Sequence, residues 1–523
     1  MIAGSLQPYA LTIDKFLDHA GKWHPRGEVV TFAGEGGTAR ATYAELRERA
    51  RGMSARLSAM GIGKGDTVAT LAWNTQAHVE VWFAAMGMGA ICHTLNPRLT
   101  ADSSAAMVRQ SNARILVASA DLSDLARAIW EQASGIEAVV IIDGADPAFV
   151  SLDPLPGGHT TWGEFDENTP CGLCFTSGTT GDPKGVTYTH RGNYLHTLRL
   201  LQADVAAISA SDAVLVAVPM FHANAWGLPF AAPAVGAKLV LPGRHVDGAS
   251  LAHLIEQEQV TIAVGVPTVW LALLDHIDAH GMHLPSLRRI MVGGAPMPQA
   301  LMERIEARGI AVQTTWGMTE LSPLGTATPP NAPDRDYSVA GKPALGVDLA
   351  ITDADGAMLP EQRNSEGHLW VRGPTVVERY FGHSEAATSD GWFATGDLAR
   401  IGDDGNLTLT GRSKDLIKSG GEWINPAEIE AAVSTHPDVA MSAVIGREDD
   451  KWGERPILIV ELIDGAATSD ADLLAPVREA CASWWVPDAV IRVATLPLAA
   501  TGKIDKLRLR QEYGRARAKE ASR

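Results

Sequence analysis

One segment of the chain combines glycines, hydroxyl side chains and a lysine in a pattern suited to phosphate. It covers residues 176–185 and reads Thr-Ser-Gly-Thr-Thr-Gly-Asp-Pro-Lys-Gly. Glycines expose backbone N–H groups, hydroxyls add neutral donors and the lysine adds a positive charge. In a Walker loop the lysine precedes serine or threonine, whereas here it precedes glycine. Ordinary surface loops use the same residue types, but this order favours a polyphosphate site formed by Thr176, Ser177, Gly178, Thr179, Thr180, Gly181 and Lys184.

Four more segments place charged or aromatic side chains beside glycine. They are WGMTE at 316–320, TGD at 395–397, GRSKD at 411–415 and TGK at 501–503. In this order and spacing, the five segments resemble the adenylate-forming superfamily, which includes acyl-CoA synthetases, peptide-synthetase adenylation domains and luciferases. The resemblance covers nearly the whole chain.

The resemblance implies a reaction in two steps on a carboxylic acid. A carboxylate is a poor electrophile, so it first attacks the α-phosphate of ATP, which releases pyrophosphate and leaves an acyl-adenylate. A thiol then takes the acyl group. Negative charge gathers around phosphorus in the first step, which favours cations and preorganised donors. The expected cofactors are ATP, Mg²⁺ and, as co-substrate, coenzyme A.

The resemblance also assigns roles to particular residues. Glu320 is the expected Mg²⁺ ligand, since carboxylates suit hard cations, and Thr319 is expected to donate to the α-phosphate. Asp397 can accept from both ribose hydroxyls, and Arg412 can reach ribose and phosphate from the hinge side. The resemblance places Gly294, Ala295 and Pro296 on one side of the adenine and Thr315 and Trp316 on the other, and Gly317 and Met318 complete the nucleotide-binding set.

Lys503 is the residue expected to carry the first step, with its ammonium bridging the attacking carboxylate and the α-phosphoryl oxygens. A lysine near a chain end is usually a solvated charge, but the surrounding sequence LAATGK at 498–503 favours the catalytic role.

Because Lys503 would then obstruct the thiol, the resemblance implies that a small domain rotates about a hinge at Lys414. Paired glycines are more often simple turns, but the sequence around them matches the family. The rotation would bring four residues to the active site to receive a pantetheine arm: Gly420, Gly421, Glu422 and Trp423.

His222 follows the end of an expected strand and allows two interpretations. A histidine among aromatic residues is usually a packed side chain, whereas the matching family position gates the acyl and thiol channels. Both stay open. The expected acyl pocket, with His222 at its entrance, is walled by Trp226, Val266, Pro267, Gly293 and Trp316. Trp316 stands where many relatives have tyrosine, so ring stacking is kept and the phenol is lost.

The elements that must position these residues alternate between helix and strand from near residue 40, which is typical of α/β layers with parallel sheets. A capping box at Thr42 and Glu45 starts a helix that Gly61 ends. Ligands collect at the carboxyl ends of such strands. Strands are expected over residues 67–73, 213–219, 261–266 and 290–292, and a helix over 251–258.

The segment lengths change near residue 415. Helices are expected over 426–434 and 470–482, and strands over 440–445, 457–462 and 489–493. This makes a compact αββαβ-like unit of about 110 residues. With the resemblance, the expected fold is α/β: a large N-terminal domain (1–413) of parallel α/β sheets with a β-barrel-like subdomain, then a small mobile α+β domain (414–523).

Composition excludes several classes of protein. The 523 residues are 46% hydrophobic and 20% charged, which is too apolar for a disordered chain. A net charge of −17 opposes general binding to nucleic acid or anionic membrane. No signal peptide or membrane span is apparent, and the four cysteines indicate a reducing compartment, so a cytoplasmic location is expected. Cys171 and Cys174 form one CxxC, for which a buried strand is favoured over a metal or redox site.

The expected function is an ATP-dependent acid–CoA ligase. Residues 316–325 and 391–430 look closest to the branch that acts on short or medium-chain fatty acids and 3-methylmercaptopropionate, where Trp392 also belongs to the CoA or acyl channel. An enzyme that loads a separate carrier protein and a non-catalytic ATP-binding scaffold are the alternatives. The combined presence of Thr179, Lys184, Glu320, Asp397, Arg412 and Lys503 disfavours the scaffold. A homodimer is left open.

Overall fold

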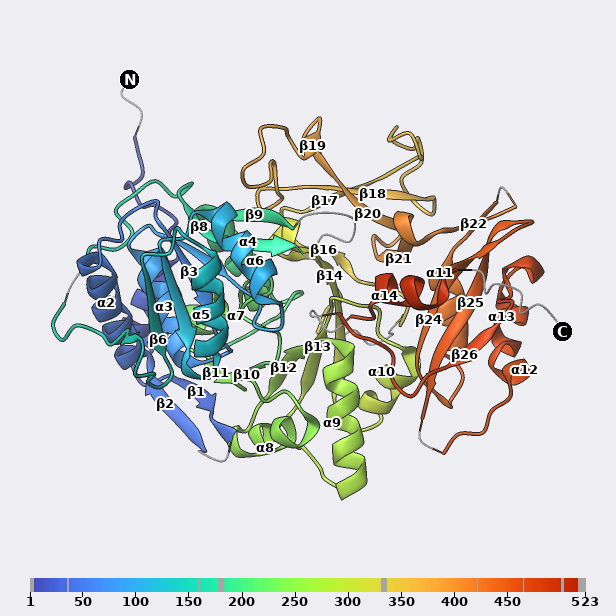
Figure 1. The fold of residues 1–523 in the computed structure, drawn as a ribbon, viewed down its shortest axis with the longest axis horizontal. Coiled ribbons are helices and arrows are strands. Elements are labelled where there is room, and N and C mark those ends of the chain that lie inside the picture. The colour runs from blue at the N-terminus through green and yellow to red at the C-terminus, as the bar shows by residue number, and fades with distance from the viewer. Residues whose placement is uncertain are drawn as a thin grey trace.

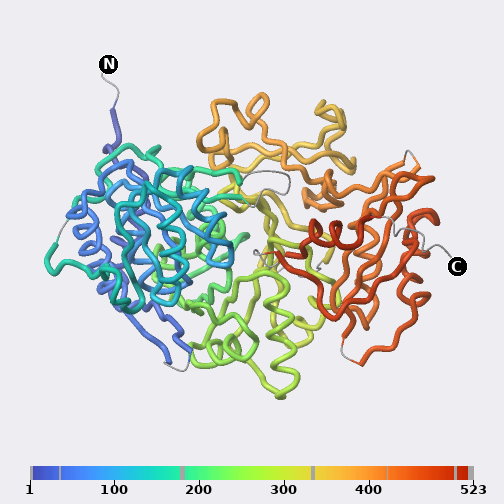
Figure 2. The backbone as a smooth tube through the Cα atoms, viewed as in Figure 1, coloured from blue at the N-terminus to red at the C-terminus, as the bar shows by residue number. Residues whose placement is uncertain are grey.

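A computed structural model describes residues 4–34, 37–158, 160–176, 183–330, 336–420, 422–463, 465–499 and 503–515. These residues form four β-sheets with helices packed on them (Figure 1). Figure 2 follows the backbone from the N-terminal residues, in blue, to the C-terminal unit, in red, at the right of the view. The α/β architecture expected from the alternating patterns is confirmed.

The first large sheet has seven strands, of which only β9 runs antiparallel to its neighbour. In spatial order they are β7 (Val150–Ser151), β6 (Ala138–Ile142), β5 (Ile115–Ser119), β3 (Thr67–Leu71), β4 (Ile91–Thr94), β8 (Pro170–Thr176) and β9 (Lys184–Thr189). Helices α2 (Tyr43–Ala59) and α3 (Gln76–Gly87) pack on one face, and α4 (Ala101–Ser111) and α5 (Ser123–Gln132) on the other.

The second large sheet has nine strands, parallel through its centre. In spatial order they are β16 (Lys342–Pro343), β15 (Leu324–Ala327), β14 (Ala311–Gly317), β13 (Arg289–Val292), β12 (Ile262–Gly265), β10 (Ala213–Val216), β11 (Lys238–Leu241), β1 (Glu28–Phe32) and β2 (Thr38–Thr42). One face carries α8 (Gly248–Glu258), α9 (Pro267–His280) and α10 (Gln299–Glu306). The other faces the largest hydrophobic core, shared with α1 (Asp14–Trp23), α3, α6 (His190–Leu200), α7 (Leu228–Val235) and β8.

The third sheet is antiparallel. Its strands are β17 (Asp348–Thr352), β18 (Glu366–Arg372), β20 (Trp392–Ile401) and β19 (Thr388–Ser389), with β21 (Leu407–Arg412) also paired to β20. The last sheet contains β23 (Glu422–Ile424), β22 (Ile417–Ser419), β25 (Gly453–Leu462), β24 (Val439–Asp449) and β26 (Val490–Arg492). Its helices are α11 (Pro426–Val433), α12 (Asp470–Leu473), α13 (Ala475–Ala480) and α14 (Lys506–Tyr513).

Local signals are largely confirmed. Thr42 accepts from the Glu45 N–H while the Glu45 carboxylate accepts from the Thr42 N–H, which forms the expected capping box. Cys171 and Cys174 are buried thiols within β8. The prediction of a single helix over residues 470–482 is wrong, because this segment forms two helices, α12 and α13. Pro476 lies at the start of the second helix, where the missing N–H of proline costs least. Among the residues described, no helix is long and apolar enough to cross a membrane.

Candidate active site

Lys503 lies in a charged cluster built from residues far apart in the chain. A methyl group placed on Gly294, just beyond β13, would lie 3.8 Å from Cε of Lys503. Burial lowers the pKa of Lys503 to about 8; Arg412 also lowers it, while Asp397 and Glu320 raise it. The lysine expected to carry adenylation is therefore among the expected nucleotide-binding residues.

Asp397 and Arg412 lie directly opposite each other on β20 and β21. Arg412 Nε is 2.6 Å from Asp397 Oδ1, and Trp316 Nε1 donates to Asp397 Oδ2 at 2.9 Å. Burial raises the pKa of Asp397, and the Arg412 charge opposes that shift. Each carboxylate oxygen can accept more than one hydrogen bond, so the paired Asp397 can still accept from hydroxyls.

Thr319 and Glu320 lie on a short helical turn, η4 (Thr319–Leu321), which follows β14. Glu320 is buried, and its Oε1 accepts from the Tyr380 hydroxyl at 3.0 Å. Burial raises the pKa of Glu320, and Tyr380, Arg412 and Lys184 lower it. Lys184 stacks over Tyr380, with Nζ 4.9 Å from the ring centroid.

The Glu320 carboxylate fits Mg²⁺, which binds proteins through one or two carboxylates and completes its shell with phosphate and water. Over the described ranges, no group of three or more His, Cys, Asp or Glu side chains could hold a metal on its own. A single buried carboxylate beside the Lys503 cluster therefore suits an ion that arrives with a nucleotide.

The expected adenine and acyl walls meet at the carboxyl ends of β12, β13 and β14. A methyl group on Gly293 would collide with the Thr315 hydroxyl and lie 3.1 Å from Trp226 Cη2. One on Gly294, which has φ +81°, would lie 3.4 Å from Val266 Cγ1. Pro267, next to Val266, starts α9. Gly317 ends β14, Met318 precedes η4, and Ala295 and Pro296 follow Gly294.

Trp226 is carried into this region by an unusual turn, η3 (Ala223–Gly227). Its backbone is left-handed at four consecutive non-glycine residues, with φ values of 44°, 53°, 46° and 54° at positions 223–226. Such a conformation costs an L-residue about 1–2 kcal/mol. His222 immediately precedes the turn. Burial, together with the nearby Lys503 charge, lowers the pKa of His222 to about 4, so the ring is neutral near pH 7.

Of the residues expected to serve the second step, only Lys414 is among the charges that act on Lys503 and Asp397 in the described structure. Gly420, with φ +60°, lies in the turn between β22 and β23. A methyl group added to Gly420 would lie 2.7 Å from Trp452 Cε3. Trp423 is 53% exposed, Lys418 Nζ lies 5.4 Å from its ring, and Glu422 is also exposed. Lys414 lies on η5 (Ser413–Asp415), and burial lowers its pKa. Trp392 begins β20, with Arg372 4.4 Å from its ring.

Part of the expected site lies outside the described residues. Thr176 and Lys184 pair across β8 and β9, at the two ends of the phosphate segment. The described residues leave out Ser177, Gly178, Thr179, Thr180, Gly181 and Gly421.

Two tyrosines were missed by the sequence analysis. Tyr380 contacts Glu320 as above, and the Tyr188 hydroxyl donates to the Thr319 carbonyl at 2.8 Å. Neither belongs to a recognisable motif. Tyr188 lies in β9, where a tyrosine is usually a packing residue, and Tyr380 lies in a loop between β18 and β19, so only the folded arrangement reveals these contacts.

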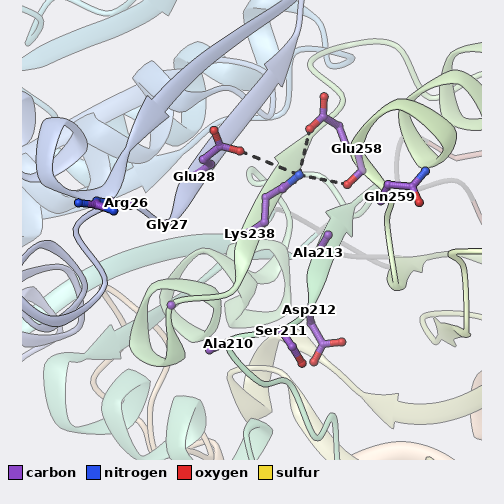
Figure 3. Close-up of a pocket in the computed structure, with 11 residues that line it drawn as sticks. Arg26, Gly27, Glu28, Ala210, Ser211, Asp212, Ala213, Lys238, Glu258 and Gln259 are labelled. Carbon is purple, nitrogen blue, oxygen red and sulfur yellow. Dashed lines mark hydrogen bonds and ion pairs between the residues drawn. The ribbon is translucent and has the colours of Figure 1, made fainter.

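A hollow of about 360 Å³ opens elsewhere, at the amino ends of β1, β10 and β11 (Figure 3). Lys238 lies there 3.3 Å from Glu258 and 4.0 Å from Glu28. Lys238 is thus already paired with two carboxylates, and the hollow lies at the end of the strands opposite to Gly293 and Gly294. The Lys503 cluster is therefore the better candidate for chemistry.

The fold and this cluster define an adenylate-forming enzyme. Residues 17–381 match the AMP-binding enzyme family, and residues 428–503 match the AMP-binding enzyme C-terminal domain. The chain belongs to the AMP-binding enzyme family, and the expected resemblance is confirmed.

Similar proteins match over almost the full length. The chain is 40% identical to a 3-methylmercaptopropionyl-CoA ligase of Ruegeria lacuscaerulensis, covering 98% of each chain. It is 39% identical to a medium-chain-fatty-acid–CoA ligase of Ectopseudomonas oleovorans, covering 98% of this chain and 97% of the other. Among solved structures, the anthranilate CoA ligase AuaEII with anthranoyl-AMP has a TM-score of 0.87 at 25% identity, covering 97% of this chain and 98% of the other.

Proposed function

We propose that this protein is an ATP-dependent acid–CoA ligase, an AMP-forming acyl-CoA synthetase. It converts a carboxylic acid, ATP and CoA into acyl-CoA, AMP and pyrophosphate through an acyl-adenylate. The observation that carries the proposal is the burial of the Lys503 amine beside Gly294, among Asp397, Arg412 and Glu320. Full-length relatives named as CoA ligases support the reaction class.

In the first step Lys503 brings two anions together. ATP and the acid are both negative, so their arrival favours the charged amine, which bridges the attacking carboxylate and the α-phosphoryl oxygens. Thr319 donates to the α-phosphate. Glu320 holds Mg²⁺, which neutralises phosphate charge when bound.

The nucleoside half of ATP is held by the groups around Asp397. Asp397 accepts the ribose hydroxyls, and Arg412 fixes the orientation of that carboxylate from β21. Trp316 stacks on the adenine while its indole N–H stays bonded to Asp397. One hydrogen-bonded group therefore contacts both the base and the sugar.

The acyl chain lies against Trp226, Val266, Pro267 and Gly293, with neutral His222 near Lys503. Apart from the imidazole, this wall is apolar. An apolar wall suits an uncharged acyl chain. The tip of Trp226 against Gly293 limits the depth of the pocket. We therefore assign short and medium-chain acids, including fatty acids and thioether acids such as 3-methylmercaptopropionate, as the substrate class.

In the second step the C-terminal domain, residues 414–523, rotates against residues 1–413 about Lys414. The division is supported by the last sheet, whose strands pair only with each other within the described chain. Rotation withdraws Lys503 and brings Gly420, Gly421, Glu422 and Trp423 to the pantetheine arm. The present exposure of Glu422 and Trp423 is consistent with a state that precedes this rotation.

The test is pyrophosphate release over a panel of acids from two to twelve carbons, with thioether and aryl members, in the presence of Mg²⁺. Acid-dependent release followed by acyl-CoA formation supports the proposal. Acyl transfer only to a holo-carrier protein would instead favour the carrier-loading enzyme, and no release with any acid would favour the scaffold. Cytoplasmic location and homodimeric assembly stay predictions, to be checked by cell fractionation and sedimentation.

A further inference from the structure

Arg199 is a buried cation on α6, outside the expected site. It is 3% exposed, and burial lowers its pKa to about 10. Its Nε donates to the Leu345 carbonyl at 2.8 Å, and NH1 donates to the Leu324 carbonyl at 3.3 Å and the Thr375 hydroxyl at 3.1 Å. No ion pair to Arg199 is present among the described residues. A buried charge held by neutral groups is costly to keep, so its contacts call for an explanation.

These contacts converge on the segment that carries Thr319 and Glu320. The Thr375 hydroxyl that accepts from Arg199 donates to the Leu321 carbonyl at 3.0 Å, and Ser322 Oγ donates to the Thr375 carbonyl at 2.9 Å. The Val377 N–H donates to the Glu320 carbonyl at 2.7 Å. Arg199 is thus the charged member of a network that fixes several backbone groups of residues 319–324.

His196, three residues earlier on α6, reaches the same segment. It is 1% exposed, and its Nε2 accepts from the Leu324 N–H at 3.3 Å, which requires the neutral ring. Burial lowers the pKa of His196 to about 3, which keeps the ring neutral.

The other edge of the His196 ring backs the turn that carries Trp226. A methyl group on Gly227 would lie 2.8 Å from His196 Nδ1, and Gly227 has φ +78°. The imidazole therefore lies between the acyl-side turn η3 and the segment that follows η4.

We propose that His196 and Arg199 are positioning residues that form a buried clamp. Through this clamp, α6 holds the Thr319–Glu320 segment and the Trp226 turn in the relative position that adenylation requires. This inference rests on the proposed function and extends it to two residues that contact neither ATP nor acid. The Arg199 contacts serve mainly the first step, because the Mg²⁺ held by Glu320 is needed only while pyrophosphate is leaving, whereas the Trp226 turn behind His196 contacts the acyl group in both steps.

The test separates the two half-reactions in Arg199→Met, which keeps chain length but removes the charge and the donors. ATP–pyrophosphate exchange uses the best acid of the panel, and thiolysis uses the matching synthetic acyl-AMP with CoA. A displacement of reacting groups by about 1 Å costs on the order of 100-fold, so we expect exchange to fall by about 30- to 100-fold and thiolysis to stay within about threefold. Equal losses in both half-reactions, or no loss in either, would overturn the clamp.

Two His196 variants test the contact between His196 and the Leu324 N–H. They also keep the proposal testable if Arg199→Met does not fold. His196→Gln can keep an acceptor near the Leu324 N–H, whereas His196→Leu cannot. We expect exchange within about threefold of wild type for His196→Gln and a loss of about tenfold or more, with a raised KM for the acid, for His196→Leu. Identical behaviour of the two variants would contradict the proposal.

Thr197→Val is the matched control, since Thr197 is buried on the same helix but its hydroxyl donates, within the described part of the chain, to the Asn193 carbonyl of that helix. We expect both half-reactions to stay near wild type. Thermal unfolding of each variant establishes that it is folded. If wild-type protein shows neither half-reaction, the proposed function itself fails, which is a different outcome from loss of the clamp.

Discussion

Trp316 and Asp397 are joined by a hydrogen bond from the indole Nε1 to Oδ2 at 2.9 Å, with Arg412 on the other carboxylate oxygen at 2.6 Å. The residue expected to stack on adenine therefore also orients the residue expected to bind ribose. A tyrosine at position 316 would place its hydroxyl differently from the indole N–H. The structure thus gives a reason for tryptophan at this position.

Trp316→Phe keeps an aromatic face and removes the donor to Asp397. Hydrogen bonds to charged groups contribute about 1.5–3 kcal/mol, so we expect the KM for ATP to rise by about tenfold or more. The KM for the acid should change much less, and steady-state kinetics with each substrate varied in turn provides the measurement. An effect confined to the acid would place Trp316 only on the acyl side.

The rate of adenylation should depend on the proton of Lys503. Its pKa of about 8, below the ordinary 10.5, means that the free enzyme loses the ammonium charge as pH rises through 8. We expect kcat/KM for pyrophosphate release to fall above about pH 8, with kcat falling at a higher pH because bound anions favour the charged amine.

Unfolding does not account for that decline. Between about pH 8 and 10.5 the unfolded chain binds more protons at this lysine than the folded chain, so this group makes the free energy of unfolding rise with pH. Thermal unfolding over the same pH range is the control. A flat kcat/KM from pH 7 to 9.5 would contradict the role of the amine.

Tyr380→Phe removes the hydroxyl that donates to Glu320 at 3.0 Å. Groups that orient a metal ligand typically contribute 10–100-fold to metal affinity or activity. We expect the Mg²⁺ concentration needed for half-maximal exchange to rise by about tenfold, measured by Mg²⁺ titration at fixed ATP. His383→Phe provides a control, since His383 packs against the Tyr380 ring at 6.2 Å without contacting Glu320 in the described structure.

Trp226→Ala should deepen the acyl pocket, because the indole tip fills the space against Gly293. One methylene in an apolar pocket is worth about 1–3 kcal/mol, so the preference should shift toward longer acids. We expect the ratio of kcat/KM for dodecanoate to that for butyrate to rise at least tenfold. An unchanged ratio with a uniform loss of activity would mean that Trp226 does not limit depth.

The sequence predicted the parallel sheets, three of the five strands of the last sheet and most of the charged cluster, because these depend on periodicity and on ordered motifs. Lys503 and Asp397 carry such signals. Tyr380 and Tyr188 do not, since their contacts with Glu320 and Thr319 arise only when distant parts of the chain are brought together. The left-handed turn at 223–226 was also unpredicted: only Asn224 there readily adopts that conformation, and tertiary packing must hold the others.

The central claim is that the Lys503 amine serves adenylation and not thiolysis. The most direct measurement compares Lys503→Ala with wild type in ATP–pyrophosphate exchange and in CoA-dependent thiolysis of a synthetic acyl-AMP. Loss of one preorganised charged donor typically costs about 3–4 kcal/mol at the barrier, so we predict at least a 100-fold loss in exchange with thiolysis retained within a few-fold. A loss of less than tenfold in exchange, or an equal loss in both half-reactions, would contradict the account.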